Sequence, residues 1–182
     1  MKKRTEIRLA GEGGQGMILA GIILAEAAAI YDGKQATQTQ SYGPEARGGA
    51  SRSEVVISDV EIDHPEVLEP DIVVALSQEA YRKFGKTIRS DGLLIVDEDR
   101  VETEPESKAI KVPVVRLSRE LTGRAITANT ISLGVLVGLS GVVSRQAIEQ
   151  AVADRAPKGT EEMNRKALEA GFAEAEKMRV AK

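Results

Sequence analysis

Apolar runs and polar breaks alternate along most of the chain. Short, continuous apolar runs bounded by polar residues are typical of strands buried on both faces of a parallel sheet. Residues 71–76 and 92–99 contain such runs. Residues 6–10 are expected to form the first strand, and 109–118 contains a further strand, where Pro113 indicates an edge or a break. The Gln- and Thr-rich segment 34–40 predicts a strand that is poorly buried on both faces.

Longer segments predict helices. Residues 17–31 are rich in Ala, Leu and Ile on nearly all sides, which is typical of a helix covered by neighbouring elements. Further helices are expected within 78–84, 129–141, 145–156 and 161–177. Ser77, Ser144 and Thr160 precede three of them, as N-cap residues do.

The region between the second predicted strand and residue 71 is irregular. Residues 53–63 fit two short strands around a tight turn at 58–60, and we expect a hairpin insertion within 45–62. Because strands otherwise alternate with helices, the sequence predicts one α/β domain spanning 1–182. We expect a single open, mostly parallel sheet with helices on both faces, plus a glycine-rich loop and the β-hairpin insertion.

Composition excludes several classes of function. Apolar residues make up 42% of the 182 residues and the net charge is −3, so we expect a packed globular protein and no nucleic-acid partner. The sequence contains no cysteine, which excludes thiolate ligands and thiol nucleophiles. A single histidine, His64, cannot form a zinc site alone and is expected in a turn. The absence of a long apolar segment favours a soluble, cytoplasmic protein without membrane contact.

Four glycines within residues 11–16, "GEGGQG", follow the first strand and precede the first helix. Gly11, Gly13 and Gly16 fit Gly-x-Gly-x-x-Gly, in which backbone N–H groups approach a phosphate at a helix N-terminus. An NAD site also needs an acidic residue at the end of the second strand, and 34–40 has none. The glycines therefore indicate either phosphate contact or only a tight turn. Gln15 either faces a ligand or hydrogen-bonds to a neighbouring backbone group.

A second glycine-rich segment, "SYGPEARGG", covers residues 41–49. Arg47 has the donor geometry to hold a phosphate or a carboxylate, and Glu45 is an alternative partner for it. The density of polar residues favours a contact surface, either a ligand clamp or a subunit interface.

These two segments, together with "ANTISLG" at 128–134 and "PKGTEEMNRKALEAGF" at 157–172, resemble the gamma subunit of 2-oxoacid:ferredoxin oxidoreductases across essentially the whole chain. The resemblance implies a subunit of an enzyme that oxidatively decarboxylates a 2-oxoacid to an acyl-CoA and reduces ferredoxin. It implies that partner alpha and beta subunits hold thiamine pyrophosphate, and that iron–sulfur clusters lie in partner subunits, which include a ferredoxin-like delta subunit in some members. This chain would hold no redox centre and would be inactive alone.

The resemblance also assigns residues. It places Gly11, Gly13, Gly14, Gln15 and Gly16 on the family's first glycine loop, near coenzyme A. Its second loop corresponds to Tyr42, Gly43, Glu45, Arg47, Gly48 and Gly49. Arg47 is expected to contact coenzyme A or a partner subunit, and the other five are expected at the interface. Asn129 and Thr130 either cap the helix that they begin or face the site.

Two other functions remain open. One is a free-standing nucleotide- or flavin-binding module, which the Gly-x-Gly-x-x-Gly spacing favours but the missing ribose acid does not. The other is a purely structural assembly subunit. The identity of the 2-oxoacid is not encoded in these motifs.

Overall fold

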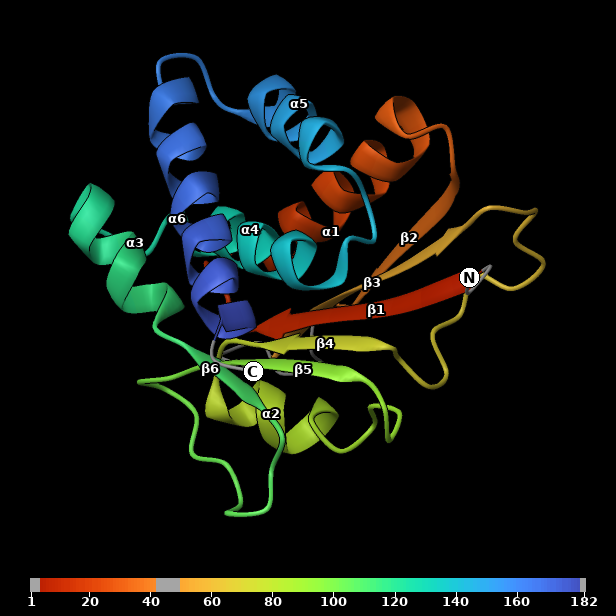
Figure 1. The fold of residues 1–182 in the computed structure, drawn as a ribbon, viewed down its shortest axis with the longest axis horizontal. Coiled ribbons are helices and arrows are strands. Elements are labelled where there is room, and N and C mark those ends of the chain that lie inside the picture. The colour runs from red at the N-terminus through yellow and green to blue at the C-terminus, as the bar shows by residue number, and fades with distance from the viewer. Residues whose placement is uncertain (1–3, 42–49, 181–182) are drawn as a thin grey trace.

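A six-stranded sheet in the order β2-β3-β1-β4-β5-β6 forms the centre of the computed structural model (Figure 1), which describes residues 4–41 and 50–180. β3 pairs antiparallel with β1 and with β2, whereas β1, β4, β5 and β6 pair in parallel. The sheet is therefore mostly parallel, as predicted. The strands are β1 (Arg4–Gly11), β2 (Gln35–Ser41), β3 (Ser51–Ser58), β4 (Ile72–Ala75), β5 (Leu93–Asp97) and β6 (Ile110–Val112).

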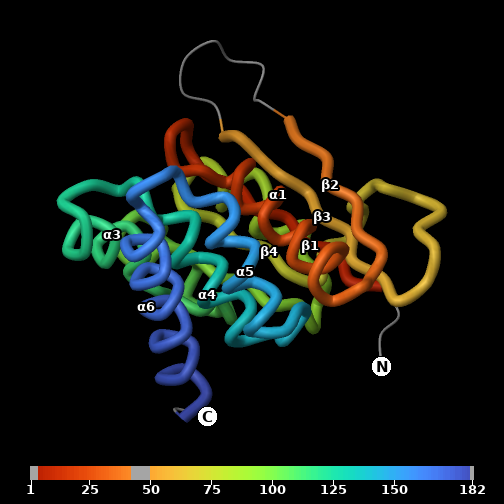
Figure 2. The backbone as a smooth tube through the Cα atoms, turned by 90° about the horizontal axis from the view of Figure 1, so that it is seen from above, coloured from red at the N-terminus to blue at the C-terminus, as the bar shows by residue number. Residues whose placement is uncertain are grey.

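Helices cover both faces of the sheet, which confirms the predicted α/β class. α2 (Gln78–Phe84) lies on one face and the other helices lie on the opposite side, as the views in Figures 1 and 2 show. Those other helices are α1 (Met17–Glu26), which continues into the π-helical turn η1 (Ala27–Tyr31), α3 (Val114–Thr122), α4 (Ala128–Ser140), α5 (Arg145–Arg155) and α6 (Glu161–Val180). No helix in the described ranges is long and apolar enough to cross a membrane.

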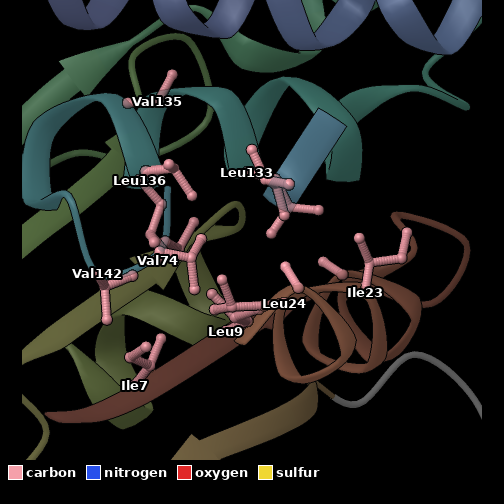
Figure 3. Close-up of a cluster of buried hydrophobic side chains, with 14 of the residues drawn as sticks. Ile7, Leu9, Ile23, Leu24, Val74, Leu133, Val135, Leu136 and Val142 are labelled. Carbon is pink, nitrogen blue, oxygen red and sulfur yellow. The ribbon is translucent and has the colours of Figure 1, made fainter. Parts of the chain in front are cut away.

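Alternate residues of the buried strands face two separate apolar cores. In β4, Ile72 and Val74 belong to the larger core, while Val73 and Ala75 belong to the smaller core beneath α2. Figure 3 shows the larger core, where Val74 and its neighbours on the sheet face side chains of α1 and α4. Continuous apolar runs are thus required because both faces of these strands are covered.

α4 and α6 pack closely because glycines line their contact. A Cβ atom built on Gly134 would lie 2.4 Å from the carbonyl oxygen of Leu168, and one on Gly171 would lie 2.2 Å from that of Ile131. Only glycine permits this approach of two helix backbones.

Two local predictions are wrong. The hairpin is formed by β2 and β3, and residues 59–63 form no strand. The connection from β3 to β4 is instead held to the sheet further along, where Arg8 donates to the carbonyl of Val67 at 3.0 Å. The second difference is α3, which begins directly after Pro113 and was not predicted. Its first turn is stabilised by Asp97, whose carboxylate accepts from the N–H of Val115 at 2.8 Å.

Three other predictions are confirmed locally. Ser77 and Ser144 accept from the third following N–H group and cap α2 and α5. β2 is half-buried or exposed along its length. His64 is exposed and lies outside any helix or strand.

Candidate functional site

The glycine loop, defined here as residues 11–16, joins the carboxyl end of β1 to the start of α1. Gly14 and Gly16 have φ angles of 87° and 73°, which side chains with a Cβ rarely adopt. Gly16 is the residue that precedes α1, and it has no side chain with which to cap this helix. The loop therefore leads to the N–H groups of the first turn of α1, which have no partner inside the helix.

Gln15 is buried and fixes the shape of this loop. Its Oε1 atom accepts from the N–H of Glu12 at 2.7 Å, and its Nε2 atom donates to the carbonyl of Leu76 at 3.2 Å. A Cβ on Gly11 would lie 2.3 Å from Oε1 of Gln15, so glycine at position 11 leaves room for the side chain. Of the two roles predicted for Gln15, the structure shows hydrogen bonds to backbone groups.

The glycine loop lies at a topological switch point of the sheet, where the helices that follow two neighbouring parallel strands lie on opposite faces. β1 is followed by α1 on one face, whereas its parallel neighbour β4 is followed by α2 on the other face (Figure 1). In open α/β sheets, ligands bind outside the carboxyl ends of strands at such a point. Residues 11–16 and 76–77 are therefore the expected binding edge.

The described residues that flank the second glycine-rich segment, Ser41 and Ser51, lie at the same edge. Gly11 of β1 is opposite Ser51 of β3, and the Ser51 hydroxyl donates to the carbonyl of Gly11 at 3.2 Å. The end of β2 is opposite Arg52. The predicted contact residues Tyr42, Gly43, Glu45, Arg47, Gly48 and Gly49 lie outside the described residues.

Asn129 and Thr130 do not cap α4 as its N-cap residues, because they are the second and third residues of the helix. A Cβ on Gly16 would lie 3.0 Å from the side-chain amide of Asn129, so this side chain touches the end of the glycine loop. The hydroxyl of Thr130 donates to Oδ1 of Asn164 in α6 at 3.1 Å. The structure thus brings "ANT" next to the first loop, which the sequence order does not show.

Two charged side chains near the edge, Arg100 and Asp97, have defined partners. Arg100, which follows β5, lies 3.2 Å from the carboxylate of Glu12. Burial raises the pKa of Asp97 above its ordinary value, and hydrogen bonds from the N–H groups of Val115 and Asp99 oppose this shift. Sequence reasoning missed both residues, although Asp97 ends the recognisable buried strand β5 and Arg100 follows it closely.

The described residues offer binding groups and no reactive set. They include no group of three or more His, Asp or Glu side chains that could hold a metal, and the sequence has no cysteine. The described part of β2 contains no carboxylate for a ribose hydroxyl. Backbone N–H groups, amides and arginines can bind, orient and shield a ligand.

Comparisons with known proteins agree with this arrangement. The family described as pyruvate ferredoxin/flavodoxin oxidoreductase matches residues 6–174. The 2-oxoglutarate synthase subunit KorC of Methanocaldococcus jannaschii is 53% identical, with 94% of each chain covered. The gamma subunit of a keto/oxoacid ferredoxin oxidoreductase from Geobacter sulfurreducens is 47% identical, with a TM-score of 0.88 over 97% of this chain and 98% of that chain.

One part of a longer protein has the same fold as this chain. The 2-oxoglutarate:ferredoxin oxidoreductase of Magnetococcus marinus, solved with 2-oxoglutarate, coenzyme A and succinyl-CoA bound, has a TM-score of 0.85 at 24% identity. The match covers 97% of this chain and 32% of that chain. The chain therefore belongs to the pyruvate ferredoxin/flavodoxin oxidoreductase family, and within it to the gamma subunits of the 2-oxoacid:ferredoxin oxidoreductases.

Proposed function

We propose that this chain is the gamma subunit of a 2-oxoglutarate:ferredoxin oxidoreductase. The complex would convert 2-oxoglutarate and coenzyme A to succinyl-CoA and carbon dioxide, with transfer of two electrons to ferredoxin. The observation that carries the choice of substrate is the 53% identity to a 2-oxoglutarate synthase subunit over 94% of both chains.

Within the complex, we propose that the glycine loop contacts coenzyme A and helps to close the active site. The loop lies at the expected ligand edge of the sheet, and its glycines permit close approach of a phosphate to backbone N–H groups. The Gln15 bonds to Glu12 and Leu76 hold the loop in one shape before a ligand arrives. Arg47 would supply a bidentate cation from the second loop.

The redox chemistry would take place in other subunits. Thiamine pyrophosphate would be held by alpha and beta subunits, and iron–sulfur clusters by partner chains that include a ferredoxin-like delta subunit. The absence of cysteine from this sequence agrees with that division, because iron–sulfur clusters are held by thiolates.

Purification of the tagged chain from its source organism tests the assignment. We expect thiamine-binding subunits to co-purify, and we expect the complex to reduce ferredoxin with 2-oxoglutarate in preference to pyruvate or 2-oxoisovalerate. A preference for one of the other acids would reject the substrate. A chain that purifies alone with a bound flavin or NAD would reject the subunit role in favour of a nucleotide-binding module.

Steady-state kinetics of the assembled complex test the contact with coenzyme A. For Arg47→Ala we expect the KM for coenzyme A to rise about tenfold, equivalent to about 1.4 kcal/mol, with kcat little changed. Arg82→Ala, on the exposed part of α2, is the matched control. An unchanged KM together with lost assembly would show that Arg47 holds a partner subunit instead.

A further inference from the structure

The sheet ends in two edge strands that differ in how they are protected. β6 has three residues, of which Lys111 is exposed, and Pro113 follows it. A short length, a lysine and a proline are devices that keep an edge strand from pairing with another chain. β2, at the opposite end of the sheet (Figure 1), has seven residues, "QATQTQS", with neither a charged residue nor a proline. The β2 edge therefore lacks the protection that the β6 edge has.

β2 is regular enough to accept another strand. It pairs with β3 at seven consecutive positions, from Gln35 opposite Ser58 to Ser41 opposite Arg52, without a bulge. Since the N–H and C=O groups of a strand point alternately to its two sides, about half of those in β2 face away from β3. Among the described residues, no strand pairs with that side. The edge is thus a row of backbone donors and acceptors to which an extended chain can add.

One hydroxyl group on β2 has no hydrogen-bond partner. The Oγ1 atom of Thr37 is shielded from solvent, and in the described ranges it is the one buried side-chain oxygen or nitrogen without a partner. Thr37 and Thr39 lie on the face of β2 opposite to Ala36, which packs against the larger core. Buried polar groups are normally bonded, so the Thr37 hydroxyl points to a partner group that the described residues do not supply.

An exposed apolar side chain flanks the same strand. The π-helical turn η1 packs against β2, and Ile30 in this turn is 65% exposed. π-Helical turns are rare and occur frequently at functional sites. A chain that pairs with β2 lies next to η1, where it can shield part of this apolar surface from water.

The sequence of β2 favours a second copy of this chain as the partner. In an antiparallel pair of two β2 strands centred on Gln38, every residue meets an uncharged residue, so no like charges are opposed. The pairs are Gln35 with Ser41, Ala36 with Gln40, Thr37 with Thr39, and Gln38 with itself. Each pair of unlike positions occurs twice, as a two-fold interface requires.

This register also supplies the missing hydrogen-bond partner. Thr37 of each copy lies directly across from Thr39 of the other, on the same face of the joined sheet. The Cβ atoms of residues paired in this way are about 4.5–5.5 Å apart, and opposed threonine hydroxyls hydrogen-bond at that separation.

We propose that the free edge of β2 pairs antiparallel with β2 of a second copy of this chain, so that the two six-stranded sheets become one continuous sheet. The backbone groups of the two edges bond to each other, and the Thr37 hydroxyl of each copy bonds to Thr39 of the other. An assembled complex would then contain two copies of this subunit. The pairing depends neither on the choice of 2-oxoacid nor on the contact with coenzyme A.

Sedimentation velocity of the full chain over a range of concentrations tests the pairing. We expect the wild type to form dimers. Thr39→Lys replaces an exposed residue by an edge lysine, and it should raise the dissociation constant of the dimer at least about tenfold. Gln146→Lys, an exposed change on α5 that adds the same charge, should associate like the wild type. A monomeric wild type, or equal association of Thr39→Lys, would overturn the proposal.

Disulfide cross-linking tests the register without weakening the edge. Because the sequence has no cysteine, each single variant has one thiol per copy. Gln38→Cys places the two thiols opposite each other on the two-fold axis, and mild oxidation should give a covalent dimer. Gln35→Cys, which faces Ser41 of the other copy, is the matched control and should not cross-link. Cross-linking through position 35 instead of position 38 would overturn the proposed pairing.

The assembled complex distinguishes a second copy from a strand of another subunit. We expect its native mass to include two copies of this chain, and we expect Thr39→Lys to separate them without changing the KM for coenzyme A. If Thr39→Lys instead releases a different subunit while the chain still self-associates, a strand of that subunit occupies the β2 edge and the proposal is wrong.

Discussion

The side-chain amide of Gln15 donates to the main-chain carbonyl of Leu76, 61 residues further along the chain. This bond joins the loop after β1 to the end of β4, two parallel strands whose following helices lie on opposite faces of the sheet. The same side chain accepts from Glu12, so one residue fixes both the shape of the glycine loop and its position on the sheet.

Replacing Gln15 by Ala should therefore destabilise the protein. The change leaves the Leu76 carbonyl and the Glu12 N–H without their partners, and we expect a loss of about 1–3 kcal/mol in the free energy of unfolding. Urea unfolding measures it. Gln40→Ala, an exposed change on β2, is the control and should alter stability by less than about 0.5 kcal/mol. Equal effects of the two changes would contradict this role of Gln15.

Substitution of three glycines in the loop distinguishes the cost of backbone strain from the cost of steric crowding. Gly13 has space for a Cβ, Gly14 has space but a positive φ, and Gly16 has a positive φ and Asn129 at 3.0 Å. Substitution by Ala should be nearly neutral at 13, cost about 1–2 kcal/mol at 14, and cost more at 16. Thermal unfolding of the three variants gives the order, and a cost at 13 as large as that at 16 would disprove it.

The contact between α4 and α6 predicts coupling between Gly138 and Ala175. A Cβ on Gly138 would lie 2.5 Å from the Cβ of Ala175, so Gly138→Ala alone should cost about 1–3 kcal/mol by overpacking. Adding Ala175→Gly restores the space. In a double-mutant cycle we expect the pair to be less destabilising than the sum of the two changes. Additive effects would show that the helices move apart at this contact without strain.

Asp97 predicts a pH dependence of stability. Since burial raises its pKa in the folded state, the native protein holds this proton to a higher pH than the unfolded chain does. Its contribution is fully present below the ordinary Asp pKa of about 3.9 and is lost as pH rises through the raised folded-state value. We expect the stability of the wild type relative to Asp97→Asn to fall with rising pH in that window.

Urea unfolding at closely spaced pH values measures this difference. Asp59→Asn, an exposed change after β3, serves as the control. A difference between wild type and Asp97→Asn that stays constant with pH would show that the carboxyl titrates alike in the folded and unfolded chains.

Local sequence was sufficient to predict those elements whose structure depends on their own residues. The strand, glycine loop and helix of residues 6–31, the serine caps of α2 and α5, and the absence of a carboxylate on β2 all follow from side chains within a few residues. The order of these elements then favours a mostly parallel sheet. The family motifs are equally local, since each occupies one short stretch.

Only the tertiary structure decided those features that depend on contacts between residues far apart in the sequence. β3 pairs with β2 and β1 rather than with residues 59–63. These two strands pair with it along nearly its whole length, one on each side. α3 begins directly after Pro113, where Asp97, 18 residues earlier than Val115, satisfies its first turn. The meeting of Gly16 with Asn129 is the same kind of result. Local patterns specify which groups the chain carries, and only packing between distant segments decides which of them meet.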